Sequence, residues 1–392
     1  MIWKRKRIYA DAAAATPLSP RAKRELIHLL DMYGNPGALH QEALDAKREL
    51  DIARESVATA IGAHPDEIVF TSGGTESNVL AIEGTLRPLL RKGPVHAITT
   101  CIEHSSVLEP LRALQAEGLE LTELAVNSAG RIALEDLEAA ITPQTALVSI
   151  QFINSEVGTI QAIRESAKVV RRARKKFETK IVFHCDASQA PLWKTIRVDA
   201  LGVDLLTLDG QKILGPKGVG ALYVRRSTAL EAQQQGGGQE RGLRSGTENV
   251  PLIGAFAAAL QDAQQQEDAV NKRIAKIRNL LLQEILKRLP DVVLNGAVGD
   301  ERVPNNLNIS IPHLDGQMAV IALSREGVAA STRSACDTNV EAPSHVLQAL
   351  GVEEKLMQCA IRFTLLPSAT QRDAQQIAAT LADVAKRYRN MA

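Results

Sequence analysis

Short apolar runs alternate with helix-like segments between residues 67 and 224. These runs lie at residues 67–71, 97–100, 146–152, 181–184, 205–208 and 220–224. Each run has the length of a strand that is buried on both faces, and several are separated by segments whose apolar residues follow helical spacing. Such alternation is typical of a largely parallel sheet covered by helices.

The helical segments differ between the two halves of the chain. Residues 42–61 predict an amphipathic surface helix that ends at Gly62, with Pro65 beyond it. After Pro251, residues 252–289 read as a long connecting helix, in spite of a glutamine-rich patch. Strands are then expected from residue 305 and over 360–365, and helices over 317–325 and 371–388. A small α/β domain at the carboxyl end follows from this order.

Composition narrows the possible partners. A chain of 392 residues, 45% apolar and 23% charged, is long enough for one large domain and a smaller one. The 46 basic and 45 acidic residues nearly cancel, so no strong field attracts nucleic acid or a membrane surface. The 4 cysteines lack CxxC spacing, which argues against disulfides and metal sites and favours a reducing compartment. No long apolar segment follows the basic amino terminus, so a cytoplasmic location is expected.

A lysine lies just beyond one apolar run, in Thr207-Leu-Asp-Gly-Gln-Lys212, and a glycine-rich turn follows it. Partial burial lowers the pKa of an amine and makes it a better nucleophile toward an aldehyde. Lys212 is therefore a candidate for a Schiff base, although a single lysine in a loop is more often a solvated surface group.

An acid directly follows another run, at Asp186 in Phe183-His-Cys-Asp. At the carboxyl end of a parallel strand its side chain faces the ligand crevice. A pyridoxal-phosphate (PLP) enzyme needs an acid there to keep the pyridine nitrogen protonated, because the charged ring is the electron sink. An aspartate that caps the next helix is an equally good interpretation of the segment alone.

Two further segments offer polar groups at strand ends. Ser72-Gly-Gly-Thr75 precedes a helical stretch, and its backbone N–H groups and hydroxyl can bind a phosphate. Glycine turns are common before helices, and the absence of the P-loop and GxGxxG patterns argues against a nucleotide. His104 follows the run 97–100, where an imidazole can stack on a ring and move protons, although a lone histidine is usually structural or exposed.

A cysteine and an arginine complete the candidates. Small and polar residues surround Cys336 in Ser331-Thr-Arg-Ser-Ala-Cys336-Asp-Thr-Asn, which favours an exposed, nucleophilic thiol over a buried structural one. Arg362 lies in an apolar run, and a buried guanidinium there requires a carboxylate partner. A substrate amino acid can supply that carboxylate.

Together these residues resemble the cysteine desulfurases of the NifS/IscS type, from about Ile8 to about Arg389. The matching segments, in chain order, are Asn35-Pro, Phe70-Thr-Ser-Gly-Gly-Thr-Glu-Ser, Glu103-His, Asp186-Ala-Ser-Gln, Lys212-Ile-Leu-Gly-Pro-Lys-Gly-Val-Gly, Gly236-Gly-Gly-Gln-Glu-Arg-Gly-Leu-Arg-Ser-Gly-Thr247, Ser334-Ala-Cys336 and Ile361-Arg-Phe. The resemblance implies the α/β architecture of fold-type I PLP enzymes. It also implies an amino-terminal segment (1–20) packed on the small domain, a large PLP-binding domain (21–258), and a connecting helix with the small, cysteine-bearing domain (259–392).

The same resemblance implies a homodimer that converts L-cysteine to L-alanine and leaves the sulfur as a persulfide on Cys336. The sulfur would then serve iron-sulfur cluster or other thio-cofactor synthesis, with a scaffold or other acceptor protein as partner. Carried onto this chain, Lys212 would bind PLP covalently and His104 would stack on the ring and assist proton transfer. The remaining expected roles fall to Asp186 at the pyridine nitrogen, Gln189 at the ring oxygen, Gly74 and Thr75 at the phosphate, Thr247 from the second subunit, and Arg362 with Asn35 at the substrate carboxylate.

The chain departs from the family pattern near the cofactor. Asp209 and Gln211 stand where the family has a phosphate-binding serine and a histidine, and Ser155 replaces an asparagine near the ring oxygen. These changes predict weaker PLP binding. Two other functions remain open from the sequence, namely a selenocysteine lyase or another class-V lyase or aminotransferase, and a catalytically weak member that acts as a scaffold subunit.

Overall fold

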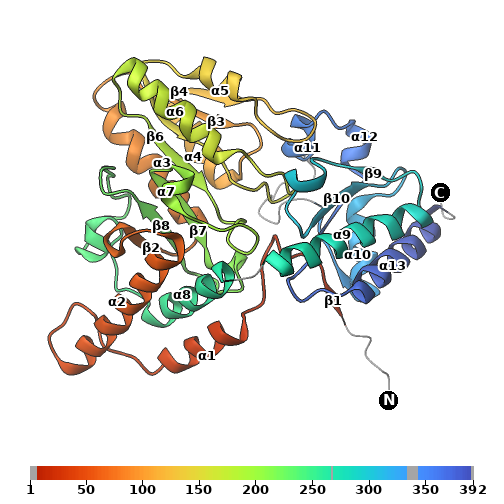
Figure 1. Ribbon diagram of the computed structural model, residues 1–392, viewed down its shortest axis with the longest axis horizontal. Helices are drawn as coiled ribbons and strands as arrows, with labels where there is room; N and C mark the ends of the chain where they lie inside the picture. Colours follow the sequence, from red (N-terminus) through yellow and green to blue (C-terminus); the bar gives the residue numbers. More distant parts are fainter. Residues whose placement is uncertain (1–6, 266–267, 333–342, 390–392) are drawn as a thin grey trace.

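A seven-stranded sheet forms the centre of the larger part of the molecule (Figure 1). The computed structural model describes residues 7–265, 268–332 and 343–389. Strands that neighbour each other between β7 and β4 are parallel, whereas β8 is antiparallel to both β7 and β2. The largely parallel sheet predicted from the apolar runs is therefore confirmed. In spatial order the strands are β2 (Ile68–Thr71), β8 (Gly220–Val224), β7 (Leu205–Asp209), β6 (Val182–Asp186), β5 (Thr145–Ser149), β3 (His96–Thr100) and β4 (Glu120–Leu124).

Both faces of this sheet are buried, and neighbours along one strand pack into different apolar clusters. In β7, Leu205 packs with Leu80 of α3 (Gly74–Leu90). Leu206 points to the opposite face and joins a cluster that includes Phe256 of α8 (Val250–Gln264). Double-sided burial explains why the strands read as continuous apolar runs. The other helices that connect these strands are α4 (Ser105–Ala116), α5 (Leu134–Ala140), α6 (Ile163–Phe177) and α7 (Val198–Leu201), with the short 3-10 turn η2 (Gly210–Lys212). A second 3-10 turn, η1 (Pro65–Glu67), leads into β2.

A smaller three-stranded antiparallel sheet lies in the second part of the molecule, in the order β12 (Ala360–Thr364), β10 (Asn306–Ser310), β9 (Val293–Leu294). The amino-terminal strand β1 (Ile8–Tyr9) pairs in parallel with β11 (Val328–Ala329) beside it. The surrounding helices are α9 (Asp268–Arg288), α10 (Gly316–Arg325), α11 (His345–Ala349), α12 (Glu354–Met357) and α13 (Gln371–Arg389), with the turn η4 (Gly299–Glu301). None of the helices in the described ranges is long and apolar enough to cross a lipid bilayer.

The prediction of a single connecting helix over residues 252–289 is wrong. The structure has two helices there: α8 packs on α1 (Pro20–Leu29) and α2 (Gln41–Ile61), whereas α9 packs on α13 (Figure 1). The glutamine-rich stretch offers no apolar face, so each flanking helix packs against its own partner. The boundary proposed between residues 258 and 259 falls inside α8. The predicted end of α2 is confirmed, since Gly62 caps it with φ of 71°.

Glu240 anchors the glycine-rich segment that follows β8 to the large sheet. It lies in the turn η3 (Gln239–Gly242) with φ of 47°, and its side chain is only 1% exposed. Its carboxylate accepts hydrogen bonds from Arg54 Nη1 (2.8 Å) and Nη2 (2.6 Å) and from the backbone N–H of Phe70 (2.9 Å). The Arg54 guanidinium also lies 4.7 Å from the centre of the Phe70 ring. One carboxylate thus fixes the segment to both α2 and β2.

Glu240→Ala is expected to destabilise the protein by about 3 to 5 kcal/mol, because it leaves the Arg54 guanidinium, which is only 17% exposed, without its buried partner. The free energy of unfolding in urea would measure this loss. Asp66→Ala is the matched control, since Asp66 forms an exposed ion pair with Arg226 and such pairs contribute at most about 1 kcal/mol. Equal losses in the two variants would contradict the anchoring role of Glu240.

Candidate active site

A small cavity of about 60 Å³ lies where β6 and β7 reach their carboxyl ends and α3 begins. Ligands of open α/β sheets bind at this edge, outside the carboxyl ends of the strands. The sequence segments that line the cavity come from both parts of the molecule. Of the residues predicted for the site, the cavity is lined by Gly74, Thr75, His104, Ser155, Asp186, Gln189, Asp209, Gln211, Lys212 and Arg362.

Lys212 is held at the cavity wall by the amino-terminal segment. It follows β7 in the turn η2, and its Nζ donates to the carbonyl oxygens of Ala13 (2.8 Å) and Ala14 (2.6 Å). The backbone N–H of Thr16 donates to the carbonyl of Gln211 (2.8 Å), which keeps the two segments together. The Gln189 side chain also donates to the Ala13 carbonyl (2.9 Å). A primary amine is thus positioned inside the cavity by fixed backbone acceptors.

Asp186 ends β6 and is held in one orientation by its neighbours. Its Oδ1 accepts from the backbone N–H (2.9 Å) and the hydroxyl (2.6 Å) of Ser188, and its Oδ2 accepts from Asn78 Nδ2 (2.9 Å). His184 precedes it on the same strand, and burial lowers the pKa of that imidazole to about 4. His184 therefore stays neutral near pH 7, and the carboxylate is available to a cationic partner in the cavity.

His104 belongs to the same hydrogen-bond network as Asp186. It is the N-cap of α4, and its Nδ1 accepts from the backbone N–H of Ser106 (3.1 Å). Asn78 Nδ2 donates both to Ser106 Oγ (2.8 Å) and to Asp186. An acceptor role at Nδ1 places the proton of the neutral ring on Nε2. The network thus fixes the tautomer of the imidazole and the orientation of the acid together.

Asp209 lies beside the first turn of α3. Its Oδ2 is 3.2 Å from the point that a Cβ on Gly74 would occupy, so only a glycine fits there easily. Its two oxygens accept from the backbone N–H and the side-chain amide of Gln211, both at 3.2 Å. Burial raises the pKa of Asp209, and the nearby Lys212 opposes that rise. A helix amino terminus attracts anions, so this carboxyl group lies where an anionic ligand would bind.

Glu103, which lies close to Asp186, is a second acid whose pKa is perturbed. Its side chain is fully buried, and Oε1 accepts from the Thr100 hydroxyl (2.7 Å) and the Gln151 backbone N–H (3.0 Å). Burial, with a smaller contribution from the charge of Asp186, raises its pKa to about 8. Glu103 is therefore mostly neutral near pH 7, which limits the negative charge around the cavity.

Arg362 on β12 is 1% exposed and reaches the cavity from the smaller sheet. Its Nη2 donates to Asp11 Oδ1 (2.8 Å), and its Nη1 donates to the carbonyl of Ser155 (3.1 Å). A guanidinium has five N–H groups, and these two bonds leave others unused, among them the buried Nε–H, which has no hydrogen-bond partner among the described residues. Asp11 therefore orients Arg362 without exhausting its capacity to bind a carboxylate.

Two predicted residues do not line this cavity, and a third lies outside the described part of the chain. Asn35 and Thr247 are exposed and absent from its wall. Cys336 lies outside the described residues, so its predicted role stays a prediction. The Cys185 thiol is buried, and burial raises its pKa far above the usual value, as burial also raises the pKa of Cys101. Neither of these two thiols is suited to nucleophilic attack at neutral pH.

Several residues of the site were missed at the level of sequence. Asn78 and Ser106 connect His104 to Asp186, and Asp11 pairs with Arg362. Asn78 follows the glycine turn by one helical turn, so its position on the helix face toward the cavity is a signal that was present. The contacts of Ala13 and Ala14 use backbone carbonyls and have no side-chain signal.

Comparison with known proteins places the whole chain among well-described relatives. Residues 8–377 match the family Aminotransferase class-V. A human protein named cysteine desulfurase is 41% identical over 388 residues, covering 98% of this chain and 83% of the relative. A solved NifS-like protein superimposes with a TM-score of 0.90 at 33% identity, covering 97% of this chain and 100% of that structure. SspA, solved in complex with cysteine, gives a TM-score of 0.80 at 34% identity, covering 93% and 100%.

Proposed function

The chain belongs to the aminotransferase class-V family and, within it, to the cysteine desulfurases, and we propose that it is a PLP-dependent enzyme that transfers sulfur from L-cysteine to Cys336. The observation that supports this most strongly is the meeting of Lys212, Asp186 and His104 in one cavity at the carboxyl edge of the sheet. The binding of cysteine by the related SspA supports the same substrate.

The residues of the cavity fit PLP. Lys212 offers an amine for the cofactor aldehyde, and Asp186, held by Ser188 and Asn78, offers a carboxylate for the pyridine nitrogen. Gly74 and Thr75 begin α3 and line the cavity, and the backbone N–H groups of this helix amino terminus would bind the phosphate. When bound, PLP supplies an electron sink for the negative charge that develops on the α-carbon of the substrate.

Proton transfer and substrate orientation fall to three side chains. His104 carries its proton on Nε2, because Nδ1 accepts from the Ser106 backbone, and we assign it ring stacking and proton movement at that atom. The Lys212 amine is the second group that can exchange a proton with the substrate. Arg362, oriented by Asp11, would bind the substrate carboxylate through its remaining N–H groups.

The sulfur step is assigned to Cys336. Its thiolate attacks the sulfur of the bound cysteine, and a sulfur–sulfur bond forms as the substrate carbon–sulfur bond breaks. The carbon keeps the bonding electrons and takes up a proton, so L-cysteine and one thiol give L-alanine and one persulfide. Burial of Cys101 and Cys185, whose pKa values it raises, supports the choice of Cys336 as the nucleophile.

Cys336→Ser is expected to retain PLP and bind L-cysteine but to release neither alanine nor sulfide above about 1% of the rate of the unchanged protein, a loss typical of removing a nucleophile.

Lys212→Ala is expected to lose the covalent attachment of PLP, which the absorbance spectrum and a peptide map after reduction would show.

Cys359→Ser is the matched control for Cys336→Ser and should turn over normally, because Cys359 is a free cysteine that does not line the cavity. Substantial sulfide release by Cys336→Ser would favour a lyase that needs no protein thiol. A protein that never takes up PLP would favour the scaffold function instead.

Asp209 and Gln211 are proposed to weaken PLP binding. Burial raises the pKa of Asp209, so the group is neutral below that pKa and becomes charged as the pH rises through it. The charged form repels a phosphate dianion, and we therefore expect PLP affinity to fall from acidic to neutral pH. The double change Asp209→Ser with Gln211→His should strengthen binding by about 1 to 3 kcal/mol at neutral pH, which is roughly 5- to 150-fold in the dissociation constant.

Titration of the apo-protein with PLP, followed by fluorescence at several pH values, would measure this effect. Asp199→Ser is the matched control, since it removes the same charge from an exposed position on α7. An unchanged dissociation constant in the double variant would show that Asp209 does not act on the phosphate.

We also propose that the enzyme is a homodimer. Large apolar side chains are exposed along α1, α2 and the loop between them, namely Ile27, Leu30, Tyr33, Leu39 and Leu44. Tyr33 is 81% and Leu39 is 91% exposed, and such a patch is typical of a protein interface. Thr247 is exposed and outside the cavity of its own chain, so it is free to complete the phosphate site of a second subunit.

Tyr33→Asp combined with Leu39→Asp is expected to halve the molar mass in solution, because two charges would be buried in the interface. Light scattering after size exclusion would measure it. Val298→Asp, at an exposed apolar position outside this patch, should leave the mass unchanged. A dimer that survives the double change would place the interface elsewhere.

The persulfide must be passed on, and we propose an acceptor protein such as an iron-sulfur scaffold as the partner. Cys101, Cys185 and Cys359 are free, which supports work in a reducing compartment such as the cytoplasm.

A further inference from the structure

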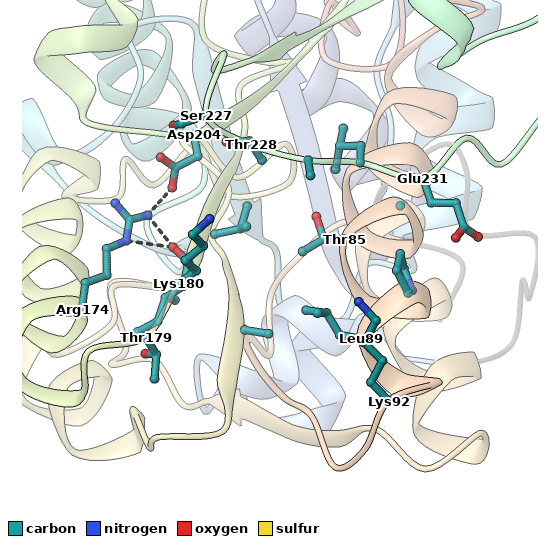
Figure 2. Close-up of a pocket in the computed structure, with 17 residues that line it drawn as sticks. Thr85, Leu89, Lys92, Arg174, Thr179, Lys180, Asp204, Ser227, Thr228 and Glu231 are labelled. Atoms are coloured by element: carbon teal, nitrogen blue, oxygen red, sulfur yellow. Dashed lines mark hydrogen bonds and ion pairs between the residues drawn. The ribbon is translucent and has the colours of Figure 1, made fainter.

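A second and larger cavity, of about 700 Å³, lies at the amino ends of the sheet strands, opposite the end that borders the first cavity. Figure 2 draws the residues that line it. Residues at the amino ends of β5 and β6 form its floor, the last turns of α3 form one wall and the end of α6 forms the other. Residues 227–231, which follow β8, close a third side. The volume falls within the range of about 300 to 1,000 Å³ that is typical of small-molecule sites. None of its lining residues belongs to the catalytic cavity.

The walls of this cavity are largely apolar. Pro88 and Leu89 contribute from α3, Ile181 and Val182 from the start of β6, and Leu230 from the segment after β8. Leu89 is 36% exposed. Val182 and Leu230 are only half buried, where they pack against the apolar cluster that contains Leu80 and Leu205. These side chains leave apolar surface in contact with water, and a ligand with an apolar body would cover it.

The charges around the cavity do not cancel. Asp204 is neutralised by an ion pair with Arg174, which is one of the dashed contacts in Figure 2, and Glu231 pairs with Arg91. Lys92 and Lys180 lie on opposite walls. Across residues 7–265, 268–332 and 343–389, no carboxylate lies within 4.0 Å of either ammonium group. The two acids already have partners and the two lysines do not, so the cavity attracts an anion.

From these features we propose that the cavity binds a small carboxylate with an apolar body. The apolar body packs between Leu89, Ile181 and Leu230, and the carboxylate binds the ammonium groups of Lys92 and Lys180. The site is independent of the proposed sulfur chemistry, because it shares no residue with the catalytic cavity. It lies at the other end of the strands that carry Asp186 and Asp209.

Sodium octanoate is a suitable probe, and isothermal titration of the PLP-loaded enzyme is the measurement. We expect one octanoate per chain, and no binding of octylammonium, whose charge is opposite. Lys92→Gln with Lys180→Gln should weaken octanoate binding at least about tenfold, the effect of two charge-assisted contacts. Lys168→Gln with Lys175→Gln is the matched control, because these exposed lysines of α6 lie outside the cavity.

Arg362 in the catalytic cavity also binds carboxylates under the proposal above, so one variant must separate the two sites. Ala229→Trp fills the second cavity from an exposed position on its wall and should abolish octanoate binding while cysteine turnover continues. Octanoate binding that survives Ala229→Trp would assign the carboxylate to another site and overturn the proposal. The proposal would also be overturned if the two double lysine variants bound octanoate equally well. It would fail likewise if octylammonium bound as tightly as octanoate, or if octanoate did not bind at all.

Discussion

The burial of both faces of the seven-stranded sheet determines where polar chemistry can occur in this molecule. Helices cover each face, and successive side chains such as Leu205 and Leu206 pack into opposite apolar clusters. Polar side chains therefore meet a ligand only where the strands end. The carboxyl ends carry Asp186 and Asp209 toward one cavity, and the amino ends border another. Both sites follow from one architectural constraint, although they differ in size and charge.

The carboxyl groups in and beside the catalytic cavity differ in their hydrogen-bond partners and in the effect of burial on them. Asp186 has fixed hydrogen-bond donors on both oxygens, which hold its carboxyl group in one orientation. Burial instead raises the pKa of Glu103 to about 8 and raises the pKa of Asp209. Glu103 therefore adds little negative charge beside Asp186 near pH 7. Asp209 differs from the other two acids in its position, because it lies at the helix amino terminus that suits a phosphate, and its charge there depends on pH.

Much of the site could be predicted because its residues follow apolar runs at strand ends. Asp186, Lys212 and His104 each come directly or shortly after such a run, and the parallel order of the sheet brings them together. Asp11, Ala13 and Ala14 could not be found in this way, since their contacts depend on how the amino-terminal segment crosses the cavity. The break between α8 and α9 was missed because helical spacing continues on both sides of it. No sequence motif marks the second cavity, because its walls come from segments that are far apart in the chain.

The catalytic cavity is closed by residues from both ends of the chain. Asp11 and Arg362, which are 351 positions apart, form one ion pair at its wall, and the carbonyls of Ala13 and Ala14 hold Lys212. A growing polypeptide therefore carries Lys212 and Asp186 out of the ribosome long before the partner of Asp11 is synthesised. Contacts of such long sequence separation form late in folding. The cavity is thus completed only after β12 has been translated, so a ligand that needs the complete cavity can bind only when nearly the whole chain has been synthesised.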